Sequence, residues 1–131
     1  MSPGEFQVEH CGVAAADTTA LKEWYAQVFG AEVVFVTDEA PPAYMIRFGG
    51  MQFEIYPSLK QIGDVQNNKL GGWRHIAIKV KSIEEARLHL ERSGVRITEP
   101  IKPAGGGGRV LFFNDPEGNI LHLVERPAEN N

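Results

Sequence analysis

The chain has little of what defines several large protein classes. Its 131 residues include one cysteine, Cys11, which excludes a disulfide scaffold and a Cys-based zinc finger. No segment approaches the roughly 18 consecutive apolar residues of a membrane-spanning helix, and Met1–Glu9 lacks the basic start and apolar run of a signal peptide. Basic residues are not in excess, because the net charge is −4, whereas a nucleic-acid binder needs a basic face. We therefore expect a cytoplasmic protein that binds neither membrane nor nucleic acid.

The length and the composition predict one ordinary domain. A chain of 131 residues with 43% hydrophobic residues can bury enough surface to fold without disulfides, and it is too short for two full domains. The first structural question is therefore how this one domain is organised.

The sequence contains a weak internal repeat that predicts two modules. Module 1 runs from about Phe6 to Pro57 and module 2 from about Trp73 to Arg126, and the polar residues 58–72 join them. Each module opens with a histidine in a strand-like run, His10 in the first and His75 in the second. The matched openings indicate that both halves follow the same plan.

A helix is predicted after each opening strand. Asp17 and Ser82 each lie seven residues after the opening histidine and are good helix N-cap residues, because their side-chain oxygens accept bonds from free backbone N–H groups. Ser82 and Glu85 also form a capping-box pattern. Apolar residues recur at helical spacing after each cap, and each helix is predicted to end at a glycine; these glycines are Gly30 and Gly94.

Three further strands are predicted in each module. The turns between the last two strands are marked by Gly49-Gly50 in module 1 and by residues 115–118, Asp-Pro-Glu-Gly, in module 2. One module of this kind exposes a sheet face that it cannot cover alone, so we expect an α+β fold of two paired βαβββ modules. The predicted strands are Glu32–Thr37, Tyr44–Phe48 and Met51–Tyr56, then Val95–Lys102, Arg109–Asn114 and Asn119–Glu125.

Four potential metal ligands occupy matched positions in the two modules. Side chains alternate between the two faces of a strand, and this alternation places His10, Glu54, His75 and His122 on the face away from the helix. His10 corresponds to His75 in the opening strands, and Glu54 corresponds to His122 in the closing strands. Imidazole and carboxylate ligands together suit zinc, nickel, iron or manganese. Paired modules would bring the four side chains together as one site for a divalent metal ion.

Most polar residues on a sheet have no function beyond solvation, so each of these residues alone would be weak evidence. The remaining histidine, His89, falls in the middle of the second predicted helix and is expected to be solvated. Tyr56, Trp73 and Phe113 are expected to pack in the core.

Three segments of the sequence resemble the vicinal oxygen chelate superfamily, which includes glyoxalase I, methylmalonyl-CoA epimerase, extradiol dioxygenases, and fosfomycin and bleomycin resistance proteins. The segments are Leu21–Val33 (LKEWYAQVFGAEV), residues 73–80 (WRHIAIKV) and Phe112–Glu125 (FFNDPEGNILHLVE). The resemblance covers nearly the whole chain. It implies paired βαβββ modules that form a curved mixed sheet around a divalent metal, in a single glyoxalase-like domain.

The resemblance also implies a role for each ligand. His10, Glu54 and His75 match the usual first three metal positions of glyoxalase I-like members. The fourth position is normally Glu in the family, and here it is His122; the nearby Glu125 has the wrong parity to replace it. The family carboxylate at this place also moves a substrate proton, so its absence leaves Glu54 and His122 as the candidate bases.

The expected function is that of a metal-dependent lyase or isomerase that acts on a small, vicinally oxygenated substrate. Such a substrate can chelate the metal, which then acts as a Lewis acid. Arg47 could bind a substrate carboxylate through its forked guanidinium group, and Arg74 and Arg109 are weaker candidates for the same role.

Two other functions stay open at the level of the sequence. An iron dioxygenase could use the same ligands, although the common two-domain extradiol enzymes are longer than this chain. A non-catalytic binding protein, as in bleomycin resistance, is disfavoured because those members lack the ligand set. Family members of this length are often homodimers, and the linker allows the modules to pair within one chain or between two.

Overall fold

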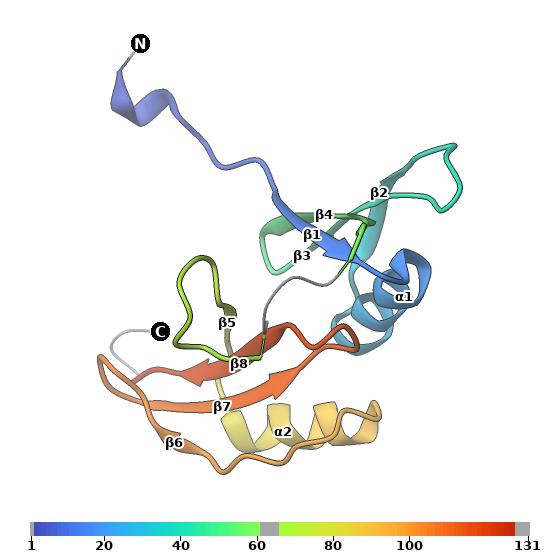
Figure 1. The fold of residues 1–131 in the computed structure, drawn as a ribbon. Helices are drawn as coiled ribbons and strands as arrows, with labels where there is room; N and C mark the ends of the chain where they lie inside the picture. Colours follow the sequence, from blue (N-terminus) through green and yellow to red (C-terminus); the bar gives the residue numbers. More distant parts are fainter. Residues whose placement is uncertain (1, 61–65, 128–131) are drawn as a thin grey trace. The chain divides into compact units, whose positions relative to one another are not determined.

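The computed structural model describes residues 2–60 and 66–127. The chain divides into two compact units, Met1–Gln61 and Ile62–Asn131, which contain modules 1 and 2 respectively. Part of the predicted linker, residues 61–65, lies outside the described residues. Each unit has one α-helix and one four-stranded sheet (Figure 1). Among the described residues, no helix has both the length and the apolar character needed to cross a membrane.

Module 1 consists of a mixed sheet covered on one face by a helix. After a short 3-10 turn, η1 (Pro3–Glu5), its elements are β1 (Cys11–Ala15), α1 (Thr18–Phe29), β2 (Glu32–Val36), β3 (Tyr44–Phe48) and β4 (Met51–Pro57). The strand order is β1-β4-β3-β2, with β1 parallel to β4 and the other pairs antiparallel. Both outer strands, β1 and β2, are edges of this sheet, and a register shift interrupts the β2–β3 pairing between Val33 and Phe35.

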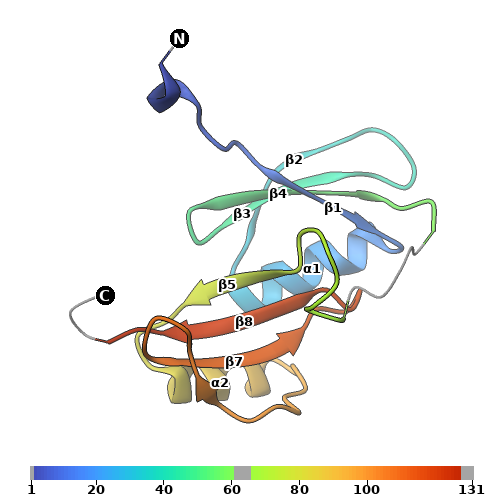
Figure 2. The same ribbon diagram turned by 60° about the vertical axis from the view of Figure 1, so that its left-hand side comes forward.

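Module 2 repeats this plan with a shorter outer strand. Its elements are β5 (His75–Lys79), α2 (Ile83–Arg92), β6 (Lys102–Pro103), β7 (Arg109–Asn114) and β8 (Ile120–Glu125). The strand order is β5-β8-β7-β6, and β5 again runs parallel to the closing strand (Figure 2). The structure therefore confirms the predicted α+β fold with two βαβββ modules.

Both helices begin at the predicted caps, and α1 ends at the predicted glycine. The Asp17 side chain accepts a hydrogen bond from the Ala20 N–H at 2.9 Å, and the Ser82 side chain accepts one from Glu85 at 3.2 Å. Helix α1 ends at Gly30, whose φ of 69° is a left-handed conformation that glycine adopts without a steric penalty. Helix α2 ends at Arg92, two residues before Gly94.

Each helix packs its apolar face on its own sheet. In module 1 the core is rich in aromatic rings, with Tyr25, Phe29, Phe48 and Phe53 in mutual contact. In module 2 the fully buried side chains are aliphatic, and they come from α2, β7 and β8: Ile83, Leu90, Leu111, Leu121 and Leu123. Of the residues that strand alternation predicts to face the helices, those of the closing strands are buried, among them Phe53, Ile55, Leu121 and Leu123, whereas Cys11 in β1 is exposed.

One predicted strand is largely wrong. The run Val95–Lys102 was expected to form a strand, but only Lys102 and Pro103 pair with β7. Pro100 and Pro103 have no backbone N–H to donate to a ladder, and proline is tolerated at sheet edges only where that donor is not needed. The outer strand of module 2 is therefore reduced to two residues.

Candidate metal centre

In module 1, two of the predicted ligands lie side by side. His10 comes directly before β1, one residue outside the strand, and Glu54 lies in β4, where it pairs with Gly12. The His10 Nε2 atom is 3.8 Å from Glu54 Oε1. The other ring nitrogen of His10 donates a hydrogen bond to the Glu9 carboxylate at 2.8 Å. The side chains of His10 and Glu54 are 34% and 44% exposed, so the pair is open to solvent.

In module 2, the other two predicted ligands also lie together. His75 begins β5, and His122 lies in β8, where it pairs with Ala77. The two imidazole rings have centroids 4.8 Å apart. The Nδ1 atom of His75 is 2.7 Å from Asn68 Oδ1, and that of His122 is 3.1 Å from the Leu123 carbonyl oxygen. Both partner atoms are acceptors, so Nδ1 carries the hydrogen in each ring.

The two pairs occupy the same register in their modules. In each case the opening histidine lies two residues before the residue that pairs with the closing ligand: Gly12 pairs with Glu54, and Ala77 pairs with His122. Strand alternation therefore places all four side chains on the faces away from the helices, as the sequence predicted.

His122 has a more enclosed environment than His10 or Glu54. Its ring is in contact with both His75 and Phe112, and the residue is only 7% exposed. Burial lowers the pKa of His122, and the neighbouring His75 adds to this effect. A lowered pKa keeps the imidazole neutral, and neutral imidazole is the form that binds metal ions.

The donor set fits a divalent metal ion. All three histidines use Nδ1 to donate to a protein oxygen, which fixes the ring and leaves Nε2 as the atom with a free lone pair. Metal-binding histidines in proteins have this arrangement, with an oxygen acceptor behind the ring. Each module supplies two of the four predicted ligands, and no group of three His, Cys, Asp or Glu suited to a metal occurs within residues 2–60 and 66–127.

The residues that contact the histidine rings were not identified from the sequence. Glu9 lies in the strand-like run that contains His10, where alternation would put neighbouring side chains on opposite faces, but in the structure β1 begins only at Cys11. Asn68 lies seven residues before His75 in the predicted linker, where no alternation applies. Phe112 pairs with His122 in the β7–β8 ladder, a contact that depends on a strand register that was not predicted from the sequence.

Arg47 and Arg74 have different surroundings. Arg47 pairs with Gln52 in the β3–β4 ladder, on the same face as Glu54, and it contacts Glu32 at 3.6 Å. Arg74 precedes β5 and donates hydrogen bonds to the backbone oxygens of its neighbours Trp73 and Asn67. Arg47 is therefore the predicted substrate-binding arginine that lies on a ligand-bearing face.

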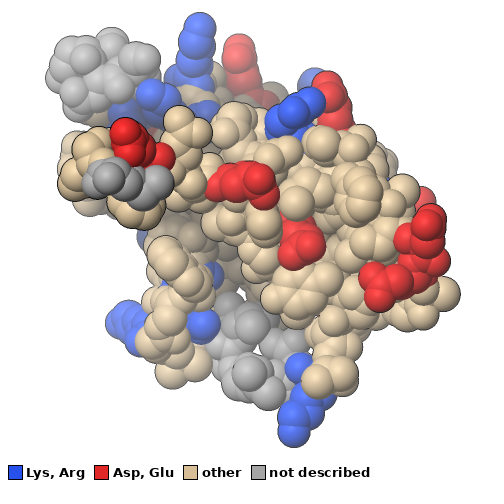
Figure 3. Space-filling model, turned by 90° about the horizontal axis from the view of Figure 1, so that it is seen from above, with Lys and Arg blue, Asp and Glu red and all other residues tan. Residues whose placement is uncertain are grey.

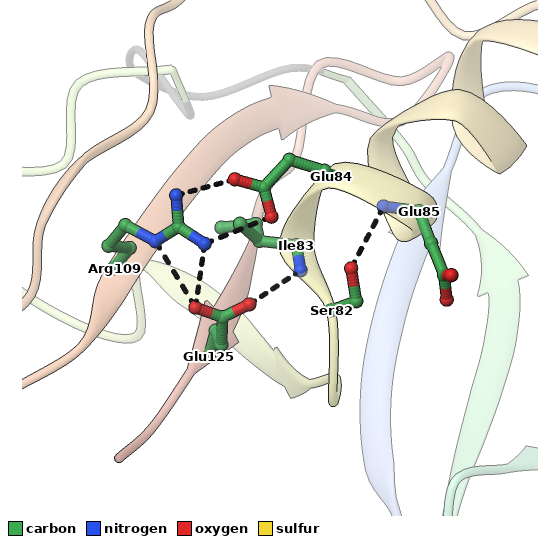
Figure 4. A network of polar contacts seen from close by, with 6 residues as sticks. All are labelled: Ser82, Ile83, Glu84, Glu85, Arg109 and Glu125. Atoms are coloured by element: carbon green, nitrogen blue, oxygen red, sulfur yellow. Dashed lines mark hydrogen bonds and ion pairs between the residues drawn. The ribbon is translucent and has the colours of Figure 1, made fainter. Parts of the chain in front are cut away.

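Arg109 is held by two carboxylates on the helix-facing side of module 2 (Figure 4). Its guanidinium group donates to both oxygens of Glu84, at 2.6 and 3.0 Å, and to Glu125 Oε1, at 2.8 and 3.1 Å. The second oxygen of Glu125 accepts from the Ile83 N–H at the start of α2. This network favours a structural role for Arg109, and it shows that Glu125 caps α2.

The Arg109 network shifts the ionisation of its members. The hydrogen bond from Ile83, followed by that from Arg109, lowers the pKa of Glu125. The Arg109 hydrogen bonds likewise lower the pKa of Glu84, and the two carboxylates raise the pKa of Arg109. All three groups therefore stay charged at neutral pH.

The expectation for three aromatic residues is partly wrong. Phe113 is buried against the helix, as predicted, at 4% exposure. Trp73 is fully exposed because it precedes β5 rather than lying in it. Tyr56 is 39% exposed, because its position in β4 gives it the same face as Glu54.

Charged side chains of both signs are scattered over the face of the molecule seen in Figure 3, and the residues described there form no continuous basic patch. This distribution agrees with the net charge of −4.

Comparison with known proteins identifies relatives over most of the chain. The family model of the Glyoxalase/Bleomycin resistance protein/Dioxygenase superfamily matches residues 7–123. The mitochondrial methylmalonyl-CoA epimerase of Mus musculus is 26% identical over 129 residues, which cover 92% of this chain and 72% of the epimerase.

Solved structures share the fold. A glyoxalase family protein from Enterococcus faecalis superposes with a TM-score of 0.79 at 27% identity, covering 93% of this chain and 99% of that protein. A fosfomycin resistance protein from Listeria monocytogenes, solved with Mn(II) and 1S,2S-dihydroxypropylphosphonic acid, has a TM-score of 0.69 at 18% identity. That comparison covers 94% of this chain and 92% of the other, and at this identity it shows the fold alone. The match over residues 7–123 and the βαβββ repeat establish that the chain belongs to the Glyoxalase/Bleomycin resistance protein/Dioxygenase superfamily.

Proposed function

We propose that this protein is a divalent-metal-dependent lyase or isomerase that acts on a small substrate with adjacent oxygen atoms. In this proposal His10, Glu54, His75 and His122 hold one metal ion when the two modules pair. The observation that carries the proposal is the matched register of two ligand pairs in which every histidine is anchored through Nδ1 and presents Nε2. The proposed site joins the modules of a single glyoxalase-like domain, within one chain or across a homodimer.

The nature of the ligands supports particular metals. Three imidazoles and one carboxylate suit Zn, Ni, Fe or Mn, and a softer, nitrogen-rich set favours Ni or Zn over Mn. Mn(II) is present in the solved fosfomycin resistance protein, so Mn(II) must be among the metals tested here. When bound, the metal would supply Lewis-acid stabilisation of negative charge on a chelating substrate.

The protein's own residues would handle the substrate and its proton. Glu54 is the only carboxylate of the four ligands and is 44% exposed, so it is the first candidate for the base. His122 is the second candidate, but its burial and its contacts with His75 and Phe112 favour a role as a fixed ligand. Arg47 lies on the same face as Glu54 and is the proposed group for a substrate carboxylate.

Two relationships support an isomerase or lyase over other chemistry. The chain belongs to the superfamily, and an epimerase is among its relatives over 92% of its length. An epimerase moves a proton at a carbon, which needs a base and stabilisation of charge, and the proposed site supplies both. The cytoplasmic location expected from the sequence stays a prediction.

Metal analysis tests the proposal directly. Purified protein is incubated with Ni, Zn, Mn or Fe(II), desalted and analysed by mass spectrometry of the metal content. We expect stoichiometric binding by the wild type and a loss of more than tenfold in affinity for His122→Ala and for His10→Ala. His89→Ala is the matched control, because His89 lies exposed on α2 and outside the site. A wild type that binds none of these metals would overturn the proposal.

Activity is tested by exchange of a substrate proton with solvent. Small acids and thioesters with adjacent oxygens, methylmalonyl-CoA among them, are incubated in D2O with the metal-loaded protein and followed by NMR. Metal-dependent deuterium uptake that is lost in Glu54→Gln supports the lyase or isomerase. Oxygen consumption with a catechol and Fe(II), without proton exchange, would instead identify a dioxygenase.

A further inference from the structure

Gly12 and Tyr56 form an unusual contact beside the first ligand pair. A Cβ atom placed on Gly12 would lie 3.0 Å from Tyr56 Cε1 and 3.5 Å from the Tyr56 hydroxyl oxygen. The phenol ring therefore occupies the space that a side chain at position 12 would fill. Gly12 pairs with Glu54 across the β1–β4 ladder. Neighbouring strands lie roughly 5 Å apart, so a ring above Gly12 is about one strand spacing from Glu54.

The face on which the ring lies is the ligand-bearing face. Tyr56 is two residues after Glu54 in β4, and Gly12 is two residues after His10, so alternation gives all four the same side of the sheet. The Tyr56 side chain leans along this face from its own pairing partner, Ala14, towards Gly12 and thus towards the ligands. Its hydroxyl has no hydrogen-bond partner among residues 2–60 and 66–127.

Module 2 has no equivalent of this arrangement. The positions that match Gly12 and Tyr56 in the common register are Ala77 and Val124, which offer neither the open space nor a hydroxyl. The repeat therefore does not require the Gly–Tyr contact, and a feature specific to module 1 needs its own explanation. One explanation is purely structural, since an aromatic ring can shield a glycine in a strand.

We propose that the Tyr56 hydroxyl is a substrate-positioning group, which donates a hydrogen bond to an oxygen of the vicinally oxygenated ligand held at the metal. Gly12 leaves room for the ring, because a Cβ atom at position 12 would require the ring to shift. The inference rests on the proposed function, and it adds the residue that orients the substrate. It also predicts a ligand with an anionic oxygen on the module 1 side, because a phenol O–H bonds most strongly to a charged acceptor.

The test uses acetohydroxamate, a small chelator with two adjacent oxygens, and Ni(II)-loaded protein in titration calorimetry. Two affinities are measured for each variant, that for Ni(II) and that for acetohydroxamate on the Ni(II)-loaded protein. Tyr56→Phe keeps the ring over Gly12 and removes only the hydroxyl. We expect its acetohydroxamate Kd to rise about tenfold, the effect of losing one hydrogen bond to a charged group, while its Ni(II) Kd changes less than twofold.

The control is Tyr44→Phe. The Tyr44 hydroxyl lies 2.9 Å from Thr19 Oγ1 at the helix side of the sheet, so its removal should change neither affinity. Gly12→Ala should weaken acetohydroxamate binding in the same direction as Tyr56→Phe, and the double variant should be no weaker than the worse single variant.

The outcomes separate the two proposals. If Tyr56→Phe binds acetohydroxamate as the wild type does, the ring only shields Gly12 and the inference is overturned while the metal site stands. The inference is also overturned if the wild type binds Ni(II) but not acetohydroxamate. If the wild type binds no metal, the proposed function itself is wrong.

Discussion

Modules 1 and 2 share a register but differ in what surrounds it. Both have the strand order in which the opening strand runs parallel to the closing one, with the proposed ligands at matched positions. The module 1 pair is open to solvent, whereas His122 is 7% exposed and packed against Phe112. Module 1 adds a cluster of aromatic rings to its buried aliphatic residues, whereas the fully buried side chains of module 2 are aliphatic. The shared strand register therefore determines where the proposed ligands lie, whereas the residues around them differ between the modules.

The outer strands differ in the same way. β2 has five residues, all exposed, and includes Phe35 at 63% exposure, whereas β6 consists of Lys102 and Pro103. Lysine and proline are residues that protect a sheet edge from further pairing. Module 2 has a protected edge, while module 1 leaves a longer apolar one exposed.

The largest expected effect comes from a core truncation that tests whether the modules fold together. Leu121 is fully buried in module 2, so Leu121→Ala should cost about 2–5 kcal/mol of unfolding free energy. With Trp73→Phe as background, the fluorescence of Trp24 reports on module 1 alone. If the chain is one domain, the Trp24 transition in urea moves to lower urea with Leu121→Ala.

The matched control for this truncation is Leu88→Ala on the exposed side of α2, at 49% exposure, which should cost less than about 0.5 kcal/mol. A Trp24 transition that ignores Leu121→Ala would mean that the modules unfold separately, against the single-domain prediction.

The next effect compares the acceptors behind the two opening histidines. Glu9→Ala and Asn68→Ala remove the oxygens bonded to His10 and His75. Each should weaken metal binding about 10- to 100-fold, the usual cost of losing such a partner, as measured by competition with a chelator. We expect the larger loss for Glu9→Ala, because a charged carboxylate is a stronger hydrogen-bond acceptor than the side-chain amide of Asn68. If metal affinity is unchanged, or falls equally in the two variants, these hydrogen bonds do not affect metal binding in the way proposed.

A smaller effect concerns pH and is confined to module 2. The pKa of Glu125 is lowered by Ile83 and Arg109, so the unfolded chain binds more protons than the folded one under mild acid. Its stabilising contribution is complete above about pH 4.3, the ordinary glutamate value, and is lost as the pH falls through the lowered folded value.

Glu125→Gln should therefore flatten the fall of the melting temperature between about pH 6 and pH 3. Glu117→Gln, in the turn before β8 and outside the Arg109 network, serves as the control in the same thermal scans. If both variants show the wild-type pH profile, the Arg109 network does not contribute to acid sensitivity.

The smallest effect compares the two helix caps. Asp17→Ala should cost about 1 kcal/mol, the usual value for a lost N-cap. Ser82→Ala should cost less, because the Glu125 carboxylate also accepts a hydrogen bond from the first turn of α2. Chemical denaturation of the two variants measures the difference. A larger cost for Ser82→Ala would mean that Glu125 adds nothing as a cap.

The fold was predictable from the sequence because its signals are local. Caps, turn glycines and strand alternation identified both helices and most strands, and alternation also placed His10, Glu54, His75 and His122 on the correct faces. The predicted strand Val95–Lys102 is largely absent, because the prediction gave more weight to the apolar residues of this run than to Pro100. Glu9 was missed because the strand-like run around His10 is irregular before Cys11, so alternation does not hold there, and Asn68 was missed because it lies in the linker.

The arginines that the sequence predicts to bind substrate show the limit of such reasoning. Alternation put Arg47 on the face that carries Glu54, whereas Arg109 lies on the helix-facing side, where Glu84 and Glu125 bind its guanidinium group. Those partners come from α2 and β8, so the pairing depends on tertiary packing, which a sequence pattern does not encode.

The parallel pairing of opening and closing strands has a consequence for the order of folding. His10 and Glu54 are 44 residues apart along the chain, and His75 and His122 are 47 residues apart, so each pair forms only when the most distant strands of its module meet. Contacts of such long sequence separation are the slowest to form. A nascent chain that has not yet reached β4 would contain His10 but not Glu54. If the proposed metal site is present, metal uptake would report the completion of folding, since an intermediate without the closing strands would lack one member of each proposed ligand pair.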